Sequence, residues 1–96
     1  MADAAISVNN DSAHSRYVVQ IDGRAVGFAA YRVAPGQVVF THTVIDPDVS
    51  GHGVGSALAG AALDDVRRQG KKVVALCPFI AAFIGQHTEY ADLLAE

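Results

Sequence analysis

The first half of the chain alternates short runs rich in β-branched and aromatic residues with short polar segments. The runs cover residues 4–8, 16–21, 25–33 and 37–45, and their composition is typical of β-strands. Asn-Asn-Asp, Asp-Gly and Pro-Gly separate them, and the last two pairs are strong hairpin signals. Because the connections are so short, we expect these four strands to form an antiparallel meander.

The period of the hydrophobic residues changes in the second half of the chain. Over residues 54–69 apolar side chains recur at helical spacing, and Gly70 stands where a glycine commonly ends a helix. Residues 72–77 form an apolar run typical of a buried strand, and a second helix is predicted from residue 78, a proline, to about 87. A last turn or short helix follows over residues 89–95. The predicted fold class is α/β (α+β), an antiparallel β-meander followed by helix–strand–helix.

Composition and charge exclude several classes of protein. Of the 96 residues, 51% are hydrophobic and 18% are charged, which excludes a disordered chain and predicts one domain over residues 1–96. The formal net charge of −3 argues against a general nucleic-acid binder. One cysteine excludes an internal disulfide, and the Cys and His residues lack the spacing of a zinc site. Without a signal peptide or an apolar run long enough to span a membrane, we expect a soluble cytoplasmic protein.

A glycine-rich loop between a predicted strand and a predicted helix is the most informative stretch. It covers residues 46–58 and has glycines at positions 51, 53 and 55. Glycines let the backbone approach a ligand closely, and the N–H groups at the start of a helix favour an anion. The loop is therefore a candidate phosphate site, and the alternative is an ordinary strand-to-helix turn. Its sequence matches neither the P-loop motif nor the G-x-G-x-x-G motif of dinucleotide-binding proteins.

The loop resembles the acetyl-CoA pyrophosphate loop of the GNAT N-acetyltransferases, which reads Val/Ile-x-Pro followed by Gln/Arg-x-x-Gly-x-Gly/Ala. Ile45-x-Pro47 corresponds to the first part, and Gly53-x-Gly55 supplies the two glycines of the second. Ser50 stands where the superfamily usually has Gln or Arg. This departure removes a side-chain contact, whereas the main-chain anion site does not need it.

Further motifs resemble, in order and spacing, the small YjdJ-type subfamily of N-acetyltransferase domain-containing proteins. They are His42-Thr43, residues 51–58, Cys77-Pro78-Phe79 and His87-x-Glu89-Tyr90. The resemblance covers residues 17–94, which is most of the chain. Relatives often have an acidic residue after His-Thr, but this chain has Val44 there and so lacks a carboxylate general base at that position.

The resemblance implies acetyl transfer from acetyl-CoA, the cosubstrate, to an amine of a small molecule or of a protein or peptide. In that fold the fourth strand and the strand before Cys77 splay apart, and the pantetheine arm lies between them. The main chain near Val44 and Ile45 is implied to bind the arm, with a backbone N–H polarising the thioester carbonyl. The residues implied to hold the pyrophosphate are Gly51, His52, Gly53, Val54, Gly55 and Ser56. A basic cluster that either contacts the nucleotide phosphates or is simply solvated consists of Arg67, Arg68, Lys71 and Lys72.

Cys77 and His42 are the candidate catalytic residues. Cys77 precedes a proline that begins a helix, which makes it a candidate N-cap whose thiol feels the helix dipole. It is an acyl acceptor, a close contact of the thioester, or a buried and inert side chain. The imidazole of His42 suits a general base for an ammonium substrate, and the alternative is a structural histidine. For Tyr90 the alternatives are protonation of the departing CoA thiolate and packing at the C-terminus.

A second class of function stays open, namely a non-catalytic acyl-CoA-binding or regulatory module. Val44 in place of an acid supports it. So does the lack of the helical segment that follows the first strand in the superfamily and builds the acceptor site. An interaction domain whose glycine loop binds nothing is a third possibility. Measuring the binding of acetyl-CoA and CoA, and then the turnover of amines, distinguishes the transferase, the non-catalytic module and the interaction domain.

Overall fold

The computed structural model describes residues 5–49 and 53–95. Within them, five strands form one sheet in the order β1-β2-β3-β4-β5. The strands are β1 (Ile6–Asp11), β2 (Arg16–Ile21), β3 (Arg24–Ala34), β4 (Gln37–Ile45) and β5 (Lys72–Ala75). The helices are α1 (Val54–Arg68), α2 (Pro78–Gln86) and the short 3-10 helices η1 (Ser12–His14), η2 (Pro47–Val49) and η3 (Thr88–Leu93). The predicted meander followed by helix, strand and helix is confirmed.

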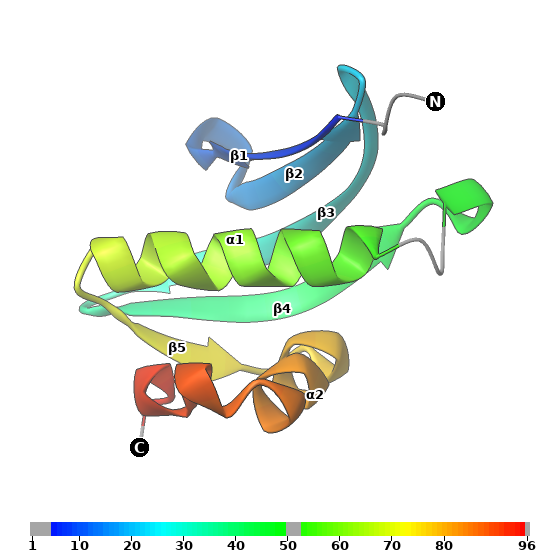
Figure 1. The fold of residues 1–96 in the computed structure, drawn as a ribbon. Helices are drawn as coiled ribbons and strands as arrows, with labels where there is room; N and C mark the ends of the chain where they lie inside the picture. Colours follow the sequence, from blue (N-terminus) through cyan, green and yellow to red (C-terminus); the bar gives the residue numbers. More distant parts are fainter. Residues whose placement is uncertain (1–4, 50–52, 96) are drawn as a thin grey trace.

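Helix α1 crosses one face of the sheet and returns the chain to the sheet edge (Figure 1). Because of this crossover, β5 runs parallel to β4, whereas β1 to β4 pair antiparallel. One core joins the sheet to α1 and α2, and its largest fully buried side chains include Phe40, Leu58, Leu63 and Ile80. We call the sheet face that α1 does not cover the outer face. It carries the side chains that alternate with the buried ones along the strands.

The first strand extends further than the sequence predicts. β1 pairs with β2 over its whole length, from Ile6 opposite Ile21 to Asp11 opposite Arg16. The Asn-Asn-Asp segment at residues 9–11, which resembles a turn, lies inside this ladder. The turn itself is η1, followed by Ser15 in the left-handed region at φ 53°. Polar residues are tolerated in β1 because it is an edge strand with mostly exposed side chains.

A buried tyrosine ties the sheet to α1. Tyr17 on β2 is only 2% exposed, and its hydroxyl donates to Oδ2 of Asp65 on α1 at 2.6 Å. Burial, followed by the hydrogen bond to the Asp65 carboxylate, raises the pKa of Tyr17 well above its ordinary value. The same hydrogen bond lowers the pKa of Asp65, with further help from Gln69 and Arg68. The pair therefore stabilises the fold while the Asp65 carboxylate is ionised.

We expect Tyr17→Phe to lower the free energy of unfolding by about 1.5–3 kcal/mol at neutral pH, the usual net value of a hydrogen bond to a charged group. The pKa of Asp65 is depressed in the folded state, so its contribution is present above the ordinary aspartate pKa of 3.8 and is lost as pH falls below it. The difference between Tyr17→Phe and the wild type should therefore shrink in acid. Urea unfolding at neutral pH and well below pH 3.8 measures this. An equal difference at both pH values contradicts the assignment.

Candidate functional site

β4 and β5 separate after a short parallel ladder, and the rest of β4 forms an open edge. The ladder ends where Phe40 lies opposite Ala75. The backbone N–H groups of Leu76 and Cys77 then both donate to the Phe40 carbonyl oxygen, at 3.1 and 3.0 Å. β4 continues through residues 41–45, which have no strand partner on this side within the described chain. We call this open edge, together with the facing junction between β5 and α2, the splay (Figure 1).

A β-bulge sets the direction of the side chains along the open edge. In the β3–β4 ladder, neighbouring β3 residues pair with Phe40 and His42, so Thr41 is the extra residue. Beyond the bulge, Thr43 lies opposite the buried Ala29 and shares its core-facing side of the sheet. His42 comes one residue earlier on the strand and therefore faces the outer face. The side chains of the two residues of the His-Thr motif thus face opposite sides of the sheet.

Cys77 lies at the mouth of the splay. It is the N-cap of α2, as predicted, with φ −78° and ψ 122°, and Pro78 follows at the first helical position. Its side chain is 2% exposed and makes no capping hydrogen bond. Instead, Sγ lies 3.3 Å from the Thr43 hydroxyl, and either atom can be the donor. No local sequence signal predicts this contact between Thr43 and Cys77.

His42 is exposed on the outer face, and the structure does not bring it to Cys77. Its ring meets Phe28 edge-on, with the ring centroids 5.8 Å apart. Nδ1 lies 3.3 Å from the hydroxyl of the neighbouring Thr41. The two candidate catalytic residues therefore lie on opposite sides of β4. They can act on one substrate only if that substrate reaches the splay from the outer face.

The described part of the glycine loop has an unusual backbone at Gly53. This residue is the N-cap of α1 and lies in the left-handed region at φ 76°, which favours glycine. Val54 is 1% exposed, so only its main chain is available to a ligand. The first N–H groups of any α-helix lack intrahelical partners, and α1 is long enough to carry a dipole. Ser50, Gly51 and His52 lie outside the described residues.

Gly55 has a packing role that no local sequence signal predicts. It lies within α1, and a Cβ atom there would be 2.8 Å from Cζ of Phe79 on α2. The absence of a side chain therefore lets the tip of the Phe79 ring pack against the start of α1. Ser56 is exposed in the next position. On the other wall of the splay, Val44 is 47% exposed, whereas Ile45 packs partly against the core.

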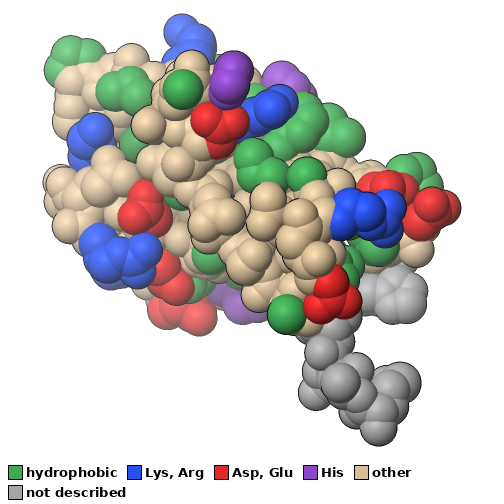
Figure 2. Space-filling model, turned by 90° about the horizontal axis from the view of Figure 1, so that it is seen from above, with side chains coloured by type: hydrophobic (Ala, Val, Ile, Leu, Met, Phe, Trp, Pro, Cys, Tyr) green, Lys and Arg blue, Asp and Glu red, His purple; other side chains and the backbone are tan. Residues whose placement is uncertain are grey.

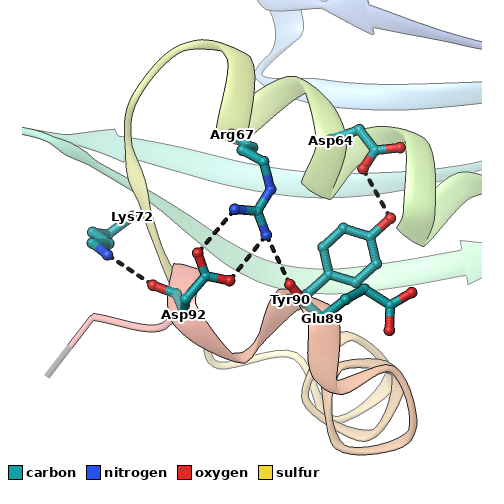
Figure 3. A network of polar contacts seen from close by, with 6 residues as sticks. All are labelled: Asp64, Arg67, Lys72, Glu89, Tyr90 and Asp92. Atoms are coloured by element: carbon teal, nitrogen blue, oxygen red, sulfur yellow. Dashed lines mark hydrogen bonds and ion pairs between the residues drawn. The ribbon is translucent and has the colours of Figure 1, made fainter.

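The residues after α2 are anchored to the rest of the fold. The Tyr90 hydroxyl donates to Oδ1 of Asp64 on α1 at 2.8 Å (Figure 3). The centroid of the Tyr90 ring lies 5.9 Å from that of Phe83. Burial, followed by the hydrogen bond to Asp64, raises the pKa of Tyr90. His87 caps the end of α2, with Nδ1 3.0 Å from the Phe83 carbonyl oxygen and its ring stacked on Phe83. These contacts favour a structural role for both residues.

The basic cluster at the end of α1 is largely engaged by the protein itself. The Arg67 guanidinium forms two hydrogen bonds with the Asp92 carboxylate, at 2.9 and 3.0 Å, and a third with the Glu89 carbonyl oxygen (Figure 3). Nζ of Lys72 donates to the Asp92 carbonyl oxygen at 2.7 Å. Acidic and basic side chains are likewise intermixed on the face shown in Figure 2. The cluster thus fastens η3 to α1 and β5.

Two further properties concern the described residues. No helix in this part of the chain is long and apolar enough to cross a membrane. Residues 5–49 and 53–95 also contain no group of three or more His, Cys, Asp or Glu side chains that could hold a metal ion.

The fold of this chain matches those of solved structures. A GCN5-like protein from Staphylococcus aureus superposes with a TM-score of 0.69, at 22% identity over 99% of this chain and 91% of its own. Ard1 from Thermoplasma volcanium superposes with a TM-score of 0.54, at 30% sequence identity over 62% of this chain and 41% of its own. The family model of the GCN5-related N-acetyl-transferases matches residues 16–93. The chain belongs to this family, and the resemblance to the GNAT superfamily is confirmed.

A relative at the sequence level is an uncharacterised N-acetyltransferase from Methanocaldococcus jannaschii. It is 30% identical over 67 residues, which are 62% of this chain and 30% of the relative. The chain therefore spans less than a third of the length of that relative.

Proposed function

We propose that the protein is an acetyl-CoA-dependent N-acetyltransferase and that the pantetheine arm of acetyl-CoA lies along the open edge of β4 in the splay. The observation that carries this proposal is the end of the β4–β5 ladder at Phe40, five residues before β4 itself ends. An unpaired strand edge offers N–H and C=O groups to an extended ligand that carries amides, as the arm does. Val44 and Ile45 lie on this edge.

The start of α1 is the proposed pyrophosphate site. The left-handed Gly53 and the N–H groups of the first turn form a main-chain anion site of the kind that glycines permit. Val54, Gly55 and Ser56 supply that turn. Gly51 and His52 belong to the same proposal through the family resemblance alone. The dipole of α1 adds a positive potential that favours the phosphates.

Bound acetyl-CoA supplies an acetyl group activated as a thioester. The amine nitrogen forms the new bond to the acetyl carbon, and the bond to sulfur breaks, so that CoA leaves as a thiolate and takes a proton from solvent. His42, exposed on the outer face, accepts the proton that the amine nitrogen gives up. A backbone N–H of the β4 edge polarises the thioester carbonyl. Cys77 lines the groove beside Thr43 and is not the acyl acceptor, because its sulfur is buried and touches a hydroxyl rather than a base.

The finer assignments belong to the same proposal. The motifs at residues 42–43, 51–58, 77–79 and 87–90 support the YjdJ-type subfamily as the narrower family. The whole chain then serves as one acetyl-CoA-binding domain in the cytoplasm, acting on an amine of a small molecule or peptide. The second candidate, a non-catalytic acyl-CoA-binding module, is favoured by the exposed Val44 where relatives often carry an acid.

The test is a titration of the isotope-labelled full chain with acetyl-CoA and with CoA, followed by an assay of CoA thiol release on adding amines. Saturable binding with amine-dependent thiol release is the expected result. Binding without release from any amine supports the non-catalytic module. No binding of either compound overturns both.

A further inference from the structure

The outer face holds a pocket that adjoins the proposed cofactor site and shares Val44 with it. Its volume is about 270 Å³, and its apolar floor includes Val18, Phe28 and Val44. Val18 pairs with Phe28 and Phe28 pairs with Val44, so the three side chains form one row across β2, β3 and β4. This volume is just below the range of about 300–1,000 Å³ that is typical of pockets for drug-sized ligands. The pocket is therefore suited to a small molecule.

Opposite charges flank this apolar row. Arg16 lines the pocket on β2, and its guanidinium carbon lies 5.2 Å from the centre of the Phe28 ring. Asp46 lines it just after β4, where its Oδ1 accepts the N–H of Asp48 at 3.0 Å. Arg16 pairs with Ala30, which lies two residues after Phe28 on β3. The N–H of Asp46 donates to the carbonyl oxygen of Val26, which lies two residues before Phe28. The two charged residues therefore lie on opposite sides of the Phe28 row.

The arginine has donor capacity that the protein leaves unused. Its Nε is buried and has no hydrogen-bond partner among residues 5–49 and 53–95. The Asp11 carboxylate forms an ion pair with Arg16, but its Oδ2 lies 3.7 Å from Nε, beyond hydrogen-bond distance. The side chain is 40% exposed, so part of the guanidinium faces solvent beside the pocket. A planar guanidinium in this position is well suited to bind a carboxylate.

The pocket also adjoins the splay. Val44 forms part of its floor, and the preceding Thr43 touches Cys77 on the other side of β4. His42 meets the same Phe28 ring that Arg16 covers. Along β4, an amine above Val44 therefore lies between the imidazole of His42 and the carboxylate of Asp46. A carboxylate on the same molecule is directed towards Arg16, across Phe28.

From this arrangement we infer that the pocket binds the acceptor, and that the acceptor is a small aliphatic amine carrying a carboxylate at the far end of its chain. This inference rests on the proposed transferase function. Asp46 attracts the ammonium group, the apolar row contacts the methylenes, and Arg16 binds the carboxylate. Amines of the same length that have no carboxylate lack the contact with Arg16.

The probe is 6-aminohexanoate, compared with 6-aminohexanamide, which has the same length but no negative charge. In the wild type we expect 6-aminohexanoate to bind at least tenfold more tightly, a difference of about 1.4 kcal/mol. Binding is followed through the backbone amides of β2, β3 and β4 without acetyl-CoA present. The KM values for the two amines in the thiol-release assay should show the same preference.

Arg16→Met keeps the apolar stem and should abolish the preference, whereas Arg32→Met should keep it, because Arg32 is exposed on β3 and does not line the pocket. Asp46→Asn retains an oxygen acceptor for the Asp48 N–H. It should weaken the binding of both amines by a similar factor. If 6-aminohexanoate binds in an Arg16-dependent way but no amine releases thiol, the pocket stands and the transferase proposal fails. Equal binding of the two amines to the wild type overturns the inference, whatever the variants do.

Discussion

Gly53→Val is expected to weaken acetyl-CoA binding at least tenfold, or about 1.4 kcal/mol, while the protein still folds. Gly53 has φ 76°, where an L side chain costs about 1–2 kcal/mol. A Cβ there would meet no atom within 4 Å, so the variant has room to fold. The valine would occupy the space in front of the first turn of α1, where the pyrophosphate is proposed to bind. Calorimetric titration of the folded variant measures the loss.

Gly36→Val is the matched control for this variant. Gly36, between β3 and β4, has φ 69°, and a Cβ atom added to it would likewise meet no other atom within 4 Å. Both variants therefore carry a similar backbone strain and should lose a similar amount of stability. Only Gly53→Val should lose affinity for acetyl-CoA. Equal affinities in the two folded variants would refute the assignment of the α1 start as the phosphate site.

Cys77→Ala is expected to lose about 1–2 kcal/mol of stability and to retain most of its transferase activity. The substitution leaves a small cavity in the core and removes the partner of the Thr43 hydroxyl. Because we propose that Cys77 lines the groove, incubation of the wild type with acetyl-CoA alone should leave no acetyl group that hydroxylamine can remove. Intact mass measurement before and after hydroxylamine checks this.

The opposite outcome is equally clear for Cys77. A hydroxylamine-sensitive acetyl adduct at this residue that passes to an amine at a competent rate would establish a two-step route. Cys77→Ala would then never acquire the label and would lose activity. Serine is a poor substitute in this test, because its hydroxyl can cap α2 and conceal the structural role of the side chain.

Hydrophobic periodicity predicts most of the fold because the elements are strongly patterned. The change from strand runs to a helical stripe after the glycine loop marks the β4–α1 boundary, and Pro78 marks the start of α2. The extent of β1 is not predictable in this way. Asn9 and Asn10 favour turns locally, but here their backbone pairs with β2, and an edge strand leaves their side chains exposed.

The site is only partly predictable, because its geometry depends on a bulge. The glycine loop and the N-cap position of Cys77 follow from local sequence signals. The extra residue at Thr41 has no such signal, yet it decides that Thr43 faces Cys77 and His42 faces the outer face. The outer pocket depends on the register of three strands, so its lining residues are far apart in sequence.

The most direct test of the central claim is the residue-level result of the acetyl-CoA titration on the isotope-labelled full chain. We expect saturable changes concentrated at the amides of residues 41–45 on the open edge of β4, at the start of α1 and at Leu76 and Cys77. The amides of β1, at the far edge of the sheet, should change little. Saturable changes confined to β1 and β2, with none along the open edge of β4, would contradict the placement of the cofactor in the splay.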